Sequence, residues 1–134
     1  MGDKKEAIDE SNPKDLIGQK KVPMSQFPPI AAAWGSAAML DGTIKYGYRN
    51  YRDKKVRATV YVDACMRHLS AWVEGEDAAE DSGIKHLGHA IACLGILLDA
   101  EANNTLLDDR VKGPYPEAVK QINEWVKRRM ENAV

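Results

Sequence analysis

All three histidines of the chain, and its densest group of acidic residues, fall between Asp63 and Asp99. His86 and His89 are three residues apart, a spacing that puts both imidazoles on one face of a helix. Imidazole nitrogens bind metal ions or hold a water molecule, and carboxylates bind Mg²⁺ or Mn²⁺. The stretch is therefore a candidate site for chemistry that uses a divalent cation.

Other interpretations of the same histidines remain open. His86 and His89 could form a hydrogen-bonded pair inside the fold, with no chemical role. Together with Cys93 they could bind zinc, although a structural zinc site normally has four ligands. The HExxH pattern of zinc proteases, the glycine-rich phosphate loops, the GxSxG motif and the motifs of zinc deaminases are all absent.

Two helices joined by an acidic turn must position these residues. The first helix is predicted from about Val56 to Gly75, with an apolar stripe and a separate polar stripe. The second contains His86 and ends near Asn103, and either Asp81 or Ser82 is expected to cap its start. The loop between them is short, so the helices should be antiparallel neighbours.

The register of this pair predicts what its groove contains. Counting back from the turn places Asp63 level with about Cys93, and Arg67 level with His89. Asp63 and Arg67 lie on the polar stripe of the first helix. We therefore expect one groove to collect Asp63, Arg67, His89 and His86.

The remainder of the chain predicts an all-α domain of four or five helices. Pro28–Pro29 presets a helix over 30–46 that is rich in small residues and anchored by Trp34. Residues 14–27 are expected to be extended, and the last helix runs over 117–130 with an apolar stripe. Residues 1–13 are expected to be a loose tail and residues 14–134 a single domain. No strand is predicted.

The segment over 45–57 interleaves cations with tyrosines. Arginine binds phosphate through two parallel hydrogen bonds, lysine binds it as a point charge, and tyrosine can stack on a base. The segment is thus a candidate triphosphate site, although a solvated basic loop has the same composition. Its candidate residues are Lys45, Tyr46, Tyr48, Arg49, Tyr51, Arg52, Lys54, Lys55 and Arg57.

Composition narrows the class of protein. The net charge is −1, which gives no reason to expect nucleic-acid binding. There is no apolar run long enough to span a membrane and no apolar segment of a secretory signal near residue 1. Cys65 and Cys93 both fall in helical apolar patterns, so we expect reduced, buried thiols in a cytoplasmic protein.

The chain also resembles a known family in four separated runs: IGQKKVPMSQFPP, KYG…RNYR, DACMRHLSAW and GED…DSGIKHLGHA. These runs resemble the phage dATP/dGTP diphosphohydrolases and span about Lys14 to Asp109. Members are similar to all-α nucleoside triphosphate pyrophosphatases of the MazG type. The resemblance extends to dGTP-cleaving members from phages whose DNA contains 2-aminoadenine. It implies a cytoplasmic enzyme, in the host cell if phage-encoded, that cleaves a (d)NTP, with guanine favoured, to the monophosphate and pyrophosphate.

The resemblance also implies roles for individual residues. MazG-type proteins carry EExxE and ExxD on successive helices, and this chain keeps only Asp63 at those positions, so Glu76 and Asp77 near the turn become the expected further ligands of Mg²⁺ or Mn²⁺. His86 or His89 would bind metal or orient the attacking water, and Tyr46, Tyr48 or Trp34 would contact the base. The expected substrate-binding residues are Lys45, Tyr46, Arg49, Asn50, Arg52 and Arg67.

MazG-type enzymes build their sites between subunits, so a homodimer or homotetramer is expected. The alternative from another class is a non-enzymatic adaptor whose amphipathic last helix docks a partner protein.

Overall fold

The structure is a computed structural model that describes residue 7 and residues 11–133. Over this range the fold is all-α apart from one pair of two-residue strands, which confirms the predicted class. The elements are α1 (Pro13–Gly18), α2 (Pro29–Tyr46), α3 (Asn50–Asp53), β1 (Val56–Arg57), α4 (Ala58–Val73), α5 (His86–Ala102), β2 (Leu106–Leu107) and α6 (Tyr115–Glu131), with a 3-10 turn over Met24–Gln26. No helix in this range has the length and apolar character of a membrane span.

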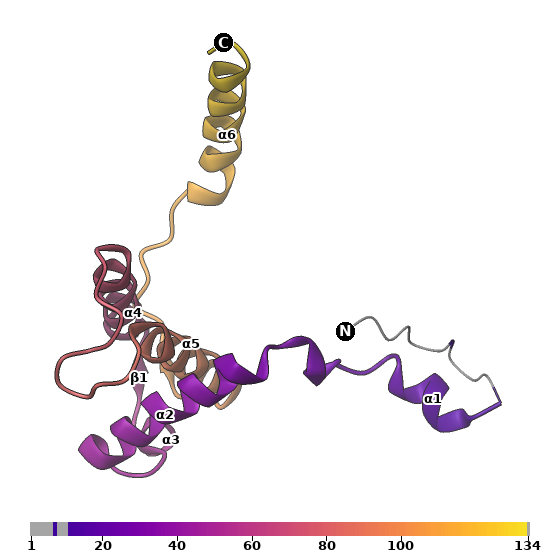
Figure 1. The fold of residues 1–134 in the computed structure, drawn as a ribbon, viewed down its shortest axis with the longest axis vertical. Helices are drawn as coiled ribbons and strands as arrows, with labels where there is room; N and C mark the ends of the chain where they lie inside the picture. The colour runs from indigo at the N-terminus through magenta and orange to yellow at the C-terminus, as the bar shows by residue number, and fades with distance from the viewer. Residues whose placement is uncertain (1–6, 8–10, 134) are drawn as a thin grey trace.

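Helix α5 lies between α2 and α4 and forms the centre of the fold (Figure 1). Apart from His86, its buried residues are small, and small side chains let helix backbones approach closely. A Cβ atom added to Gly88 would lie 2.8 Å from the carbonyl oxygen of Trp34, and one added to Gly35 would lie 2.8 Å from Cγ2 of Ile91. The α2–α5 contact therefore requires glycine on both helices.

The two strands join the start of α4 to the chain that follows α5. Strand β1 pairs in parallel with β2, and the side chain of Val56 is only 1% exposed. Asp109, just beyond β2, accepts hydrogen bonds from the backbone N–H of Thr59 at 2.9 Å and from the Thr59 hydroxyl. Its carboxylate thereby caps the first turn of α4, where helical N–H groups lack partners. The expectation of no strand was wrong for these four residues.

The N-terminal segment differs from the prediction. Residues 14–27 were expected to be extended, but α1 forms over Pro13–Gly18. The Asn12 side chain accepts from the backbone N–H of Lys14 at 3.0 Å, and Pro13 sits where a helix tolerates proline. Most of the predicted tail, residues 1–6 and 8–10, lies outside the described residues.

The acidic turn does not cap α5 as predicted. The helix begins at His86 with Lys85 at the capping position and no side-chain cap. Asp81 instead accepts from the backbone N–H of Ser82 at 2.9 Å, and the Ser82 hydroxyl accepts from Ile84 at 3.2 Å. Both residues order the turn itself, which Gly83 closes with a φ of 72°.

The level of α4 against α5 was predicted nearly correctly, but the face was wrong. Cys65 lies against α5, with its Sγ 3.8 Å from the Ala90 carbonyl oxygen. Asp63 and Arg67 are exposed, because a helix that turns about 100° per residue carries them on the side opposite Cys65 and His68. The predicted groove containing Asp63, Arg67, His89 and His86 therefore does not form.

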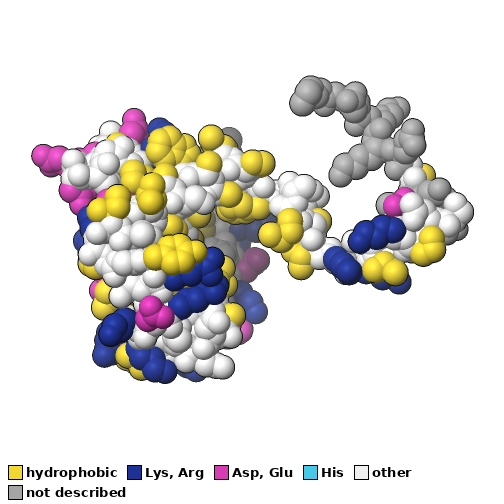
Figure 2. All heavy atoms as spheres, turned by 90° about the horizontal axis from the view of Figure 1, so that it is seen from below, with side chains coloured by type: hydrophobic (Ala, Val, Ile, Leu, Met, Phe, Trp, Pro, Cys, Tyr) yellow, Lys and Arg dark blue, Asp and Glu magenta, His cyan; other side chains and the backbone are white. Residues whose placement is uncertain are grey.

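Several large apolar side chains of α4 and α5 are exposed. On α4 and α5 they line one side of the helix pair, and helical periodicity places both sets on the same side. We call this set the α4–α5 apolar face; it comprises Val62, Met66, Leu69, Val73, Leu87, Leu94 and Leu98, which are 38–74% exposed. Figure 2 shows how widely hydrophobic side chains are spread over one view of the surface.

Helix α6 forms as predicted but projects away from the other helices (Figure 1). It has no buried residue. Its apolar side chains stay exposed, including Trp125 at 61% and Met130 at 69%. In this structure α6 thus contributes nothing to the core that α2, α4 and α5 build.

Candidate active site

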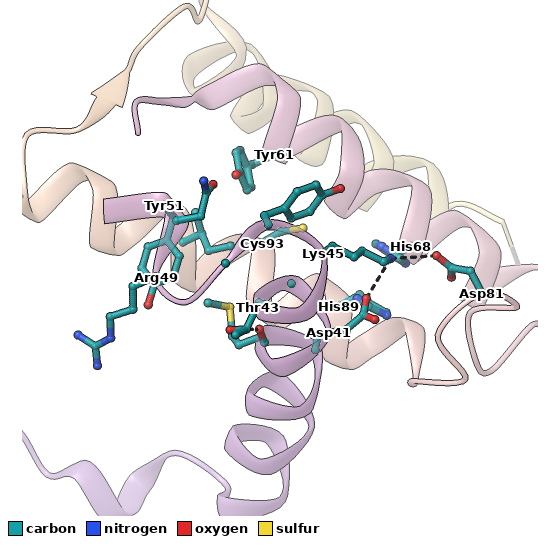
Figure 3. Close-up of a pocket in the computed structure, with 18 residues that line it drawn as sticks. Asp41, Thr43, Lys45, Arg49, Tyr51, Tyr61, His68, Asp81, His89 and Cys93 are labelled. Carbon is teal, nitrogen blue, oxygen red and sulfur yellow. Dashed lines mark hydrogen bonds and ion pairs between the residues drawn. The ribbon is translucent and has the colours of Figure 1, made fainter. Parts of the chain in front are cut away.

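A cavity of about 240 Å³ opens where α2, α4 and α5 meet the segment 47–51 that follows α2 (Figure 3). One end is charged and contains histidines, whereas tyrosines line the other part. The residues that line the cavity include Asp41, Lys45, Tyr46, Arg49, Asn50, Tyr51, Tyr61, His68, Asp81, His89 and Cys93.

At the charged end, Lys45 joins α2 to the acidic turn. Its Nζ lies 3.0 Å from Oδ2 of Asp41, one helical turn earlier, and 3.1 Å from Oδ2 of Asp81 (Figure 3). The hydrogen bond to Asp41, followed by the one to Asp81, raises the pKa of Lys45. The same bond to Lys45 lowers the pKa of Asp81. This end of the cavity therefore holds one ammonium group between two carboxylates.

The three histidines form one cluster beside this group. His86 Nε2 lies 2.6 Å from Oε1 of Glu76, and His86 Nδ1 lies 2.8 Å from Nδ1 of His68. The rings of His68 and His89 are stacked with centroids 4.6 Å apart. His89 Nε2 lies 2.8 Å from the Ser82 hydroxyl. Glu76 and Ser82, both from the turn, thus fix histidines of α5, and α4 supplies His68.

Burial is the main influence on two of these imidazoles. It lowers the pKa of His68 and of His89 below 6.5, since a charged ring is poorly solvated there. At neutral pH both rings are therefore uncharged, and each carries one N–H and one bare nitrogen. A bare imidazole nitrogen can accept a proton or bind a cation.

Three tyrosines line the remainder of the cavity wall. They are Tyr46, Tyr51 and Tyr61, and Asn50 lies beside them. Burial raises the pKa of Tyr61, which keeps its phenol protonated. Burial also raises the pKa of Cys93 to about 11, so this free cysteine is a thiol rather than a nucleophilic thiolate at neutral pH.

The structure places some predicted site residues at the cavity and others away from it. Lys45, Tyr46, Arg49, Asn50 and His89 line the wall. The guanidinium of Arg49 points away from the cavity in Figure 3. His86 is only 6% exposed and contacts the cavity through His68.

Two predicted phosphate-binding arginines lie elsewhere. Arg52 forms a two-point ion pair with Asp99 of α5, at 3.1 Å from Nε and 2.7 Å from Nη2. Arg67 is exposed on the outer side of α4. Trp34 packs at the α2–α5 contact, with Lys85 Nζ 5.4 Å from its ring centroid, so it does not reach the cavity either.

The three expected metal ligands also lie off the cavity wall. Asp63 is exposed on α4, Glu76 is hydrogen-bonded to His86, and Asp77 is exposed in the turn. Among the described residues, no three His, Cys, Asp or Glu side chains converge as a ready-made metal site. The proposed zinc site of His86, His89 and Cys93 is therefore not assembled either.

Sequence reasoning missed His68, Asp41, Asp81 and Tyr61. One signal was available for Asp41, which stands four residues before Lys45, the spacing of a helical ion pair. Another was available on α4, because Tyr61 and His68 are seven residues apart and so share a face. The predicted groove instead used the polar stripe that carries Asp63 and Arg67.

The family model described as "dATP/dGTP diphosphohydrolase, N-terminal" matches residues 11–110. The chain belongs to this family. The matched region contains every residue of the cavity wall and ends before α6. The protein is therefore a nucleoside triphosphate pyrophosphohydrolase, and the adaptor alternative gives way to an enzyme. Comparisons with curated proteins and with solved structures give no match.

Proposed function

We propose that this diphosphohydrolase cleaves a deoxynucleoside triphosphate, with dGTP favoured, to the monophosphate and pyrophosphate in the cavity between α2, α4 and α5. One observation carries the proposal: a single cavity joins an ammonium group and imidazoles at one end to three tyrosines along the other part. A nucleotide has the same two-part chemistry, an anionic triphosphate and an aromatic base.

Lys45 is the cation best placed to bind the triphosphate. Its ammonium already lies at the cavity between Asp41 and Asp81, and one of its three N–H donors remains available for another acceptor. Phosphate oxygens accept charge-assisted hydrogen bonds from lysine. Arg49 can join it by turning its exposed guanidinium inward from the rim.

The carboxylates at this end fit a divalent cation that arrives with the nucleotide. Mg²⁺ is usually held by one or two carboxylates together with substrate phosphates, rather than by a complete cage of protein ligands. Asp41 and Asp81 supply two carboxylates on the cavity wall. They would hold Mg²⁺ or Mn²⁺, which supplies charge neutralisation and a more acidic water. The roles of Asp63, Glu76 and Asp77 as ligands stay predictions that this geometry does not use.

The tyrosine end suits the base. Stacking on tyrosine is tolerant of base identity, so preference for guanine needs a hydrogen-bonding group. Asn50 lies in this part of the wall, and its side-chain amide offers both donors and an acceptor. A guanine edge presents a carbonyl oxygen beside N–H groups. An amide can donate to that oxygen and accept from the N–H groups.

An assembly of identical subunits is the quaternary structure that best accounts for the α4–α5 apolar face. Monomeric proteins rarely expose a large contiguous apolar patch. Pairing this face between two copies would bury Met66, Leu69, Leu94 and their neighbours, which are exposed in the single chain. We therefore propose a homodimer through this face, or a homotetramer built from such dimers.

The resemblance to phage enzymes is the basis for a proposed biological role. Cleavage of dGTP, or of dATP, would change the composition of the nucleotide pool available to a polymerase. We propose that the enzyme serves phage DNA synthesis in which 2-aminoadenine replaces adenine.

Incubation with dGTP or dATP and Mn²⁺, followed by separation of the products, tests the proposal. We expect dGMP and pyrophosphate, faster turnover of dGTP than of dATP, and no turnover with a chelator. Lys45→Ala should lower kcat/KM, because loss of a charge-assisted hydrogen bond costs about 1.5–3 kcal/mol. Lys120→Ala is the control, since Lys120 lies on exposed α6 and pairs there with Glu117. Release of deoxyguanosine and tripolyphosphate would contradict the proposed reaction.

A further inference from the structure

The hydrogen bonds around His86 have a direction that can be assigned. The carboxylate of Glu76 can only accept, so the 2.6 Å contact with His86 requires a hydrogen on His86 Nε2. In a neutral His86 the other nitrogen, Nδ1, is then bare and accepts a hydrogen bond. Its partner at 2.8 Å is Nδ1 of His68, which must therefore carry a hydrogen. Glu76 and His86 together select the Nδ1–H tautomer of His68.

This tautomer leaves Nε2 of His68 bare, and Nε2 is not fully buried. Nε2 has no hydrogen-bond partner among the described residues. No buried side-chain nitrogen or oxygen in that part of the chain lacks a partner, so Nε2 is not buried. His68 lines the cavity described above. The bare nitrogen therefore belongs to a residue in the wall of the space in which a substrate would react.

The surroundings hold the ring in one plane and keep it uncharged. His89 stacks on His68 with an angle of 10° between the ring planes. The groups that act on His68 are His86 and His89 of α5, Arg67 of α4 and Asp81 of the turn. Burial, His89, His86 and Arg67 lower the pKa of His68, and Asp81 opposes them. At neutral pH the ring is ready to accept a proton.

We propose that His68 is the general base of the hydrolysis and that Glu76 and His86 are positioning residues that fix its tautomer. The role rests on the proposed function of the cavity. A water oxygen bonds to a phosphorus of the α–β bridge while its proton passes to His68 Nε2. The bond from that phosphorus to the bridging oxygen breaks, and the products are the monophosphate and pyrophosphate. Whichever phosphorus is attacked, the base accepts one proton from the attacking water.

The tautomer is tested directly by ¹⁵N NMR of the histidine side chains in the full chain. We expect His68 to show a protonated Nδ1 and a bare Nε2. Glu76→Gln should weaken this preference, because an amide can donate as well as accept. Glu80→Gln is the matched control, being an acid-to-amide change at an exposed residue of the same turn. An Nε2–H tautomer of His68, or a doubly protonated His86, in the wild-type protein would overturn the proposal.

The catalytic role is tested with His68→Asn. The Asn amide can still donate to His86 from near the former Nδ1, but it has no nitrogen at the Nε2 position. We expect kcat to fall about 10²–10⁴-fold, the usual contribution of a general base. The Kd for a non-hydrolysable triphosphate should stay within about twofold, since the base contributes to reaction rather than to binding. Added imidazole should partly restore turnover in His68→Ala.

The outcomes distinguish the role of His68 from the proposed function of the cavity. Wild-type kcat in folded His68→Asn, or loss of nucleotide binding equal to the loss of kcat, would overturn the role of His68 alone. Failure of the wild-type protein to release pyrophosphate, with NMR still showing the expected tautomer, would overturn the proposed function of the cavity and with it the proposed step.

Discussion

Helices α5 and α6 have the same length, 17 residues, but α5 has buried residues and α6 has none. Helix α5 lies between two other helices and buries His86, Gly88, Ala90, Ala92, Cys93 and Ala100. Helix α6 has the clearer division into apolar and charged faces in its sequence, yet it buries nothing. Its apolar face includes Ile122, Trp125 and Met130, which are 56–69% exposed.

The difference shows that burial here depends on side-chain size as much as on amphipathic pattern. Gly88 and Ala92 let α5 approach α2 closely on one side, and Ala90 and Cys93 do the same toward α4. Close approach brings many weak contacts into range, and backbones can come together only where side chains are small. The larger apolar side chains of α6 stay exposed in this structure.

Gly88→Ala should have the largest effect on stability, because it blocks the close approach of α5 to α2. The added Cβ would lie 2.8 Å from the Trp34 carbonyl oxygen, so one backbone must move. We expect the free energy of unfolding to fall by about 1–3 kcal/mol, the usual cost of overpacking. Chemical denaturation monitored by circular dichroism measures it.

Gly95→Ala, on the same helix, is its control. An added Cβ there meets nothing within 4 Å. Alanine is a better helix former than glycine, so a gain of about 0.5–1 kcal/mol is expected. Equal effects of the two substitutions would show that α5 does not owe its place to close approach at Gly88.

Leu94→Glu tests whether the exposed stripe of α5 belongs to an interface. Leu94 is 52% exposed in the single chain. If a second copy covers it, removing the leucine costs about 1.5 kcal/mol or more per subunit, or about 3 kcal/mol per symmetric dimer, which is about a hundredfold in the dissociation constant. Sedimentation velocity over a range of protein concentrations should show the shift toward monomer. Ala33→Glu adds the same charge at an exposed position of α2 and should leave the assembly intact.

Trp125→Ala on α6 should have the smallest effect. Because Trp125 is 61% exposed and α6 buries nothing, we expect the free energy of unfolding to stay within about 0.5 kcal/mol of wild type. The same denaturation experiment measures it at a protein concentration low enough to favour monomers. A loss of about 3 kcal/mol or more, typical of a buried tryptophan, would show that α6 packs on the core in solution.

The candidate site was predictable in part. The interleaved cations and tyrosines pointed to the segment over 45–57, the spacing of the histidines pointed to His89, and the family resemblance added Asn50; Lys45, Tyr46, Asn50 and His89 do line one cavity. Asp63 did not join them, and His68 did, because the choice of face on α4 decided both. The pairing of Arg52 with Asp99 likewise depends on how α3 and α5 meet, 47 residues apart in the chain.

By itself, the sequence determined the long helices. Pro28–Pro29, the 3.6-residue period and the acidic turn place α2, α4, α5 and α6 within a few residues of where they occur, because these are local properties of the chain. Helical period also determined which residues share a face: Tyr61 with His68, and Asp63 with Arg67.

Which face of α4 packs against α5 depends on the tertiary structure. Helix α4 has two faces that could pack, one through Tyr61, Cys65 and His68 and another through Met66 and Leu69. The less apolar face packs against α5, because the small residues of α5 allow close approach there and His86 forms a hydrogen bond with His68. Local pattern carries no information about such partners, since they come from residues about 20 positions away that meet α4 only when the turn closes.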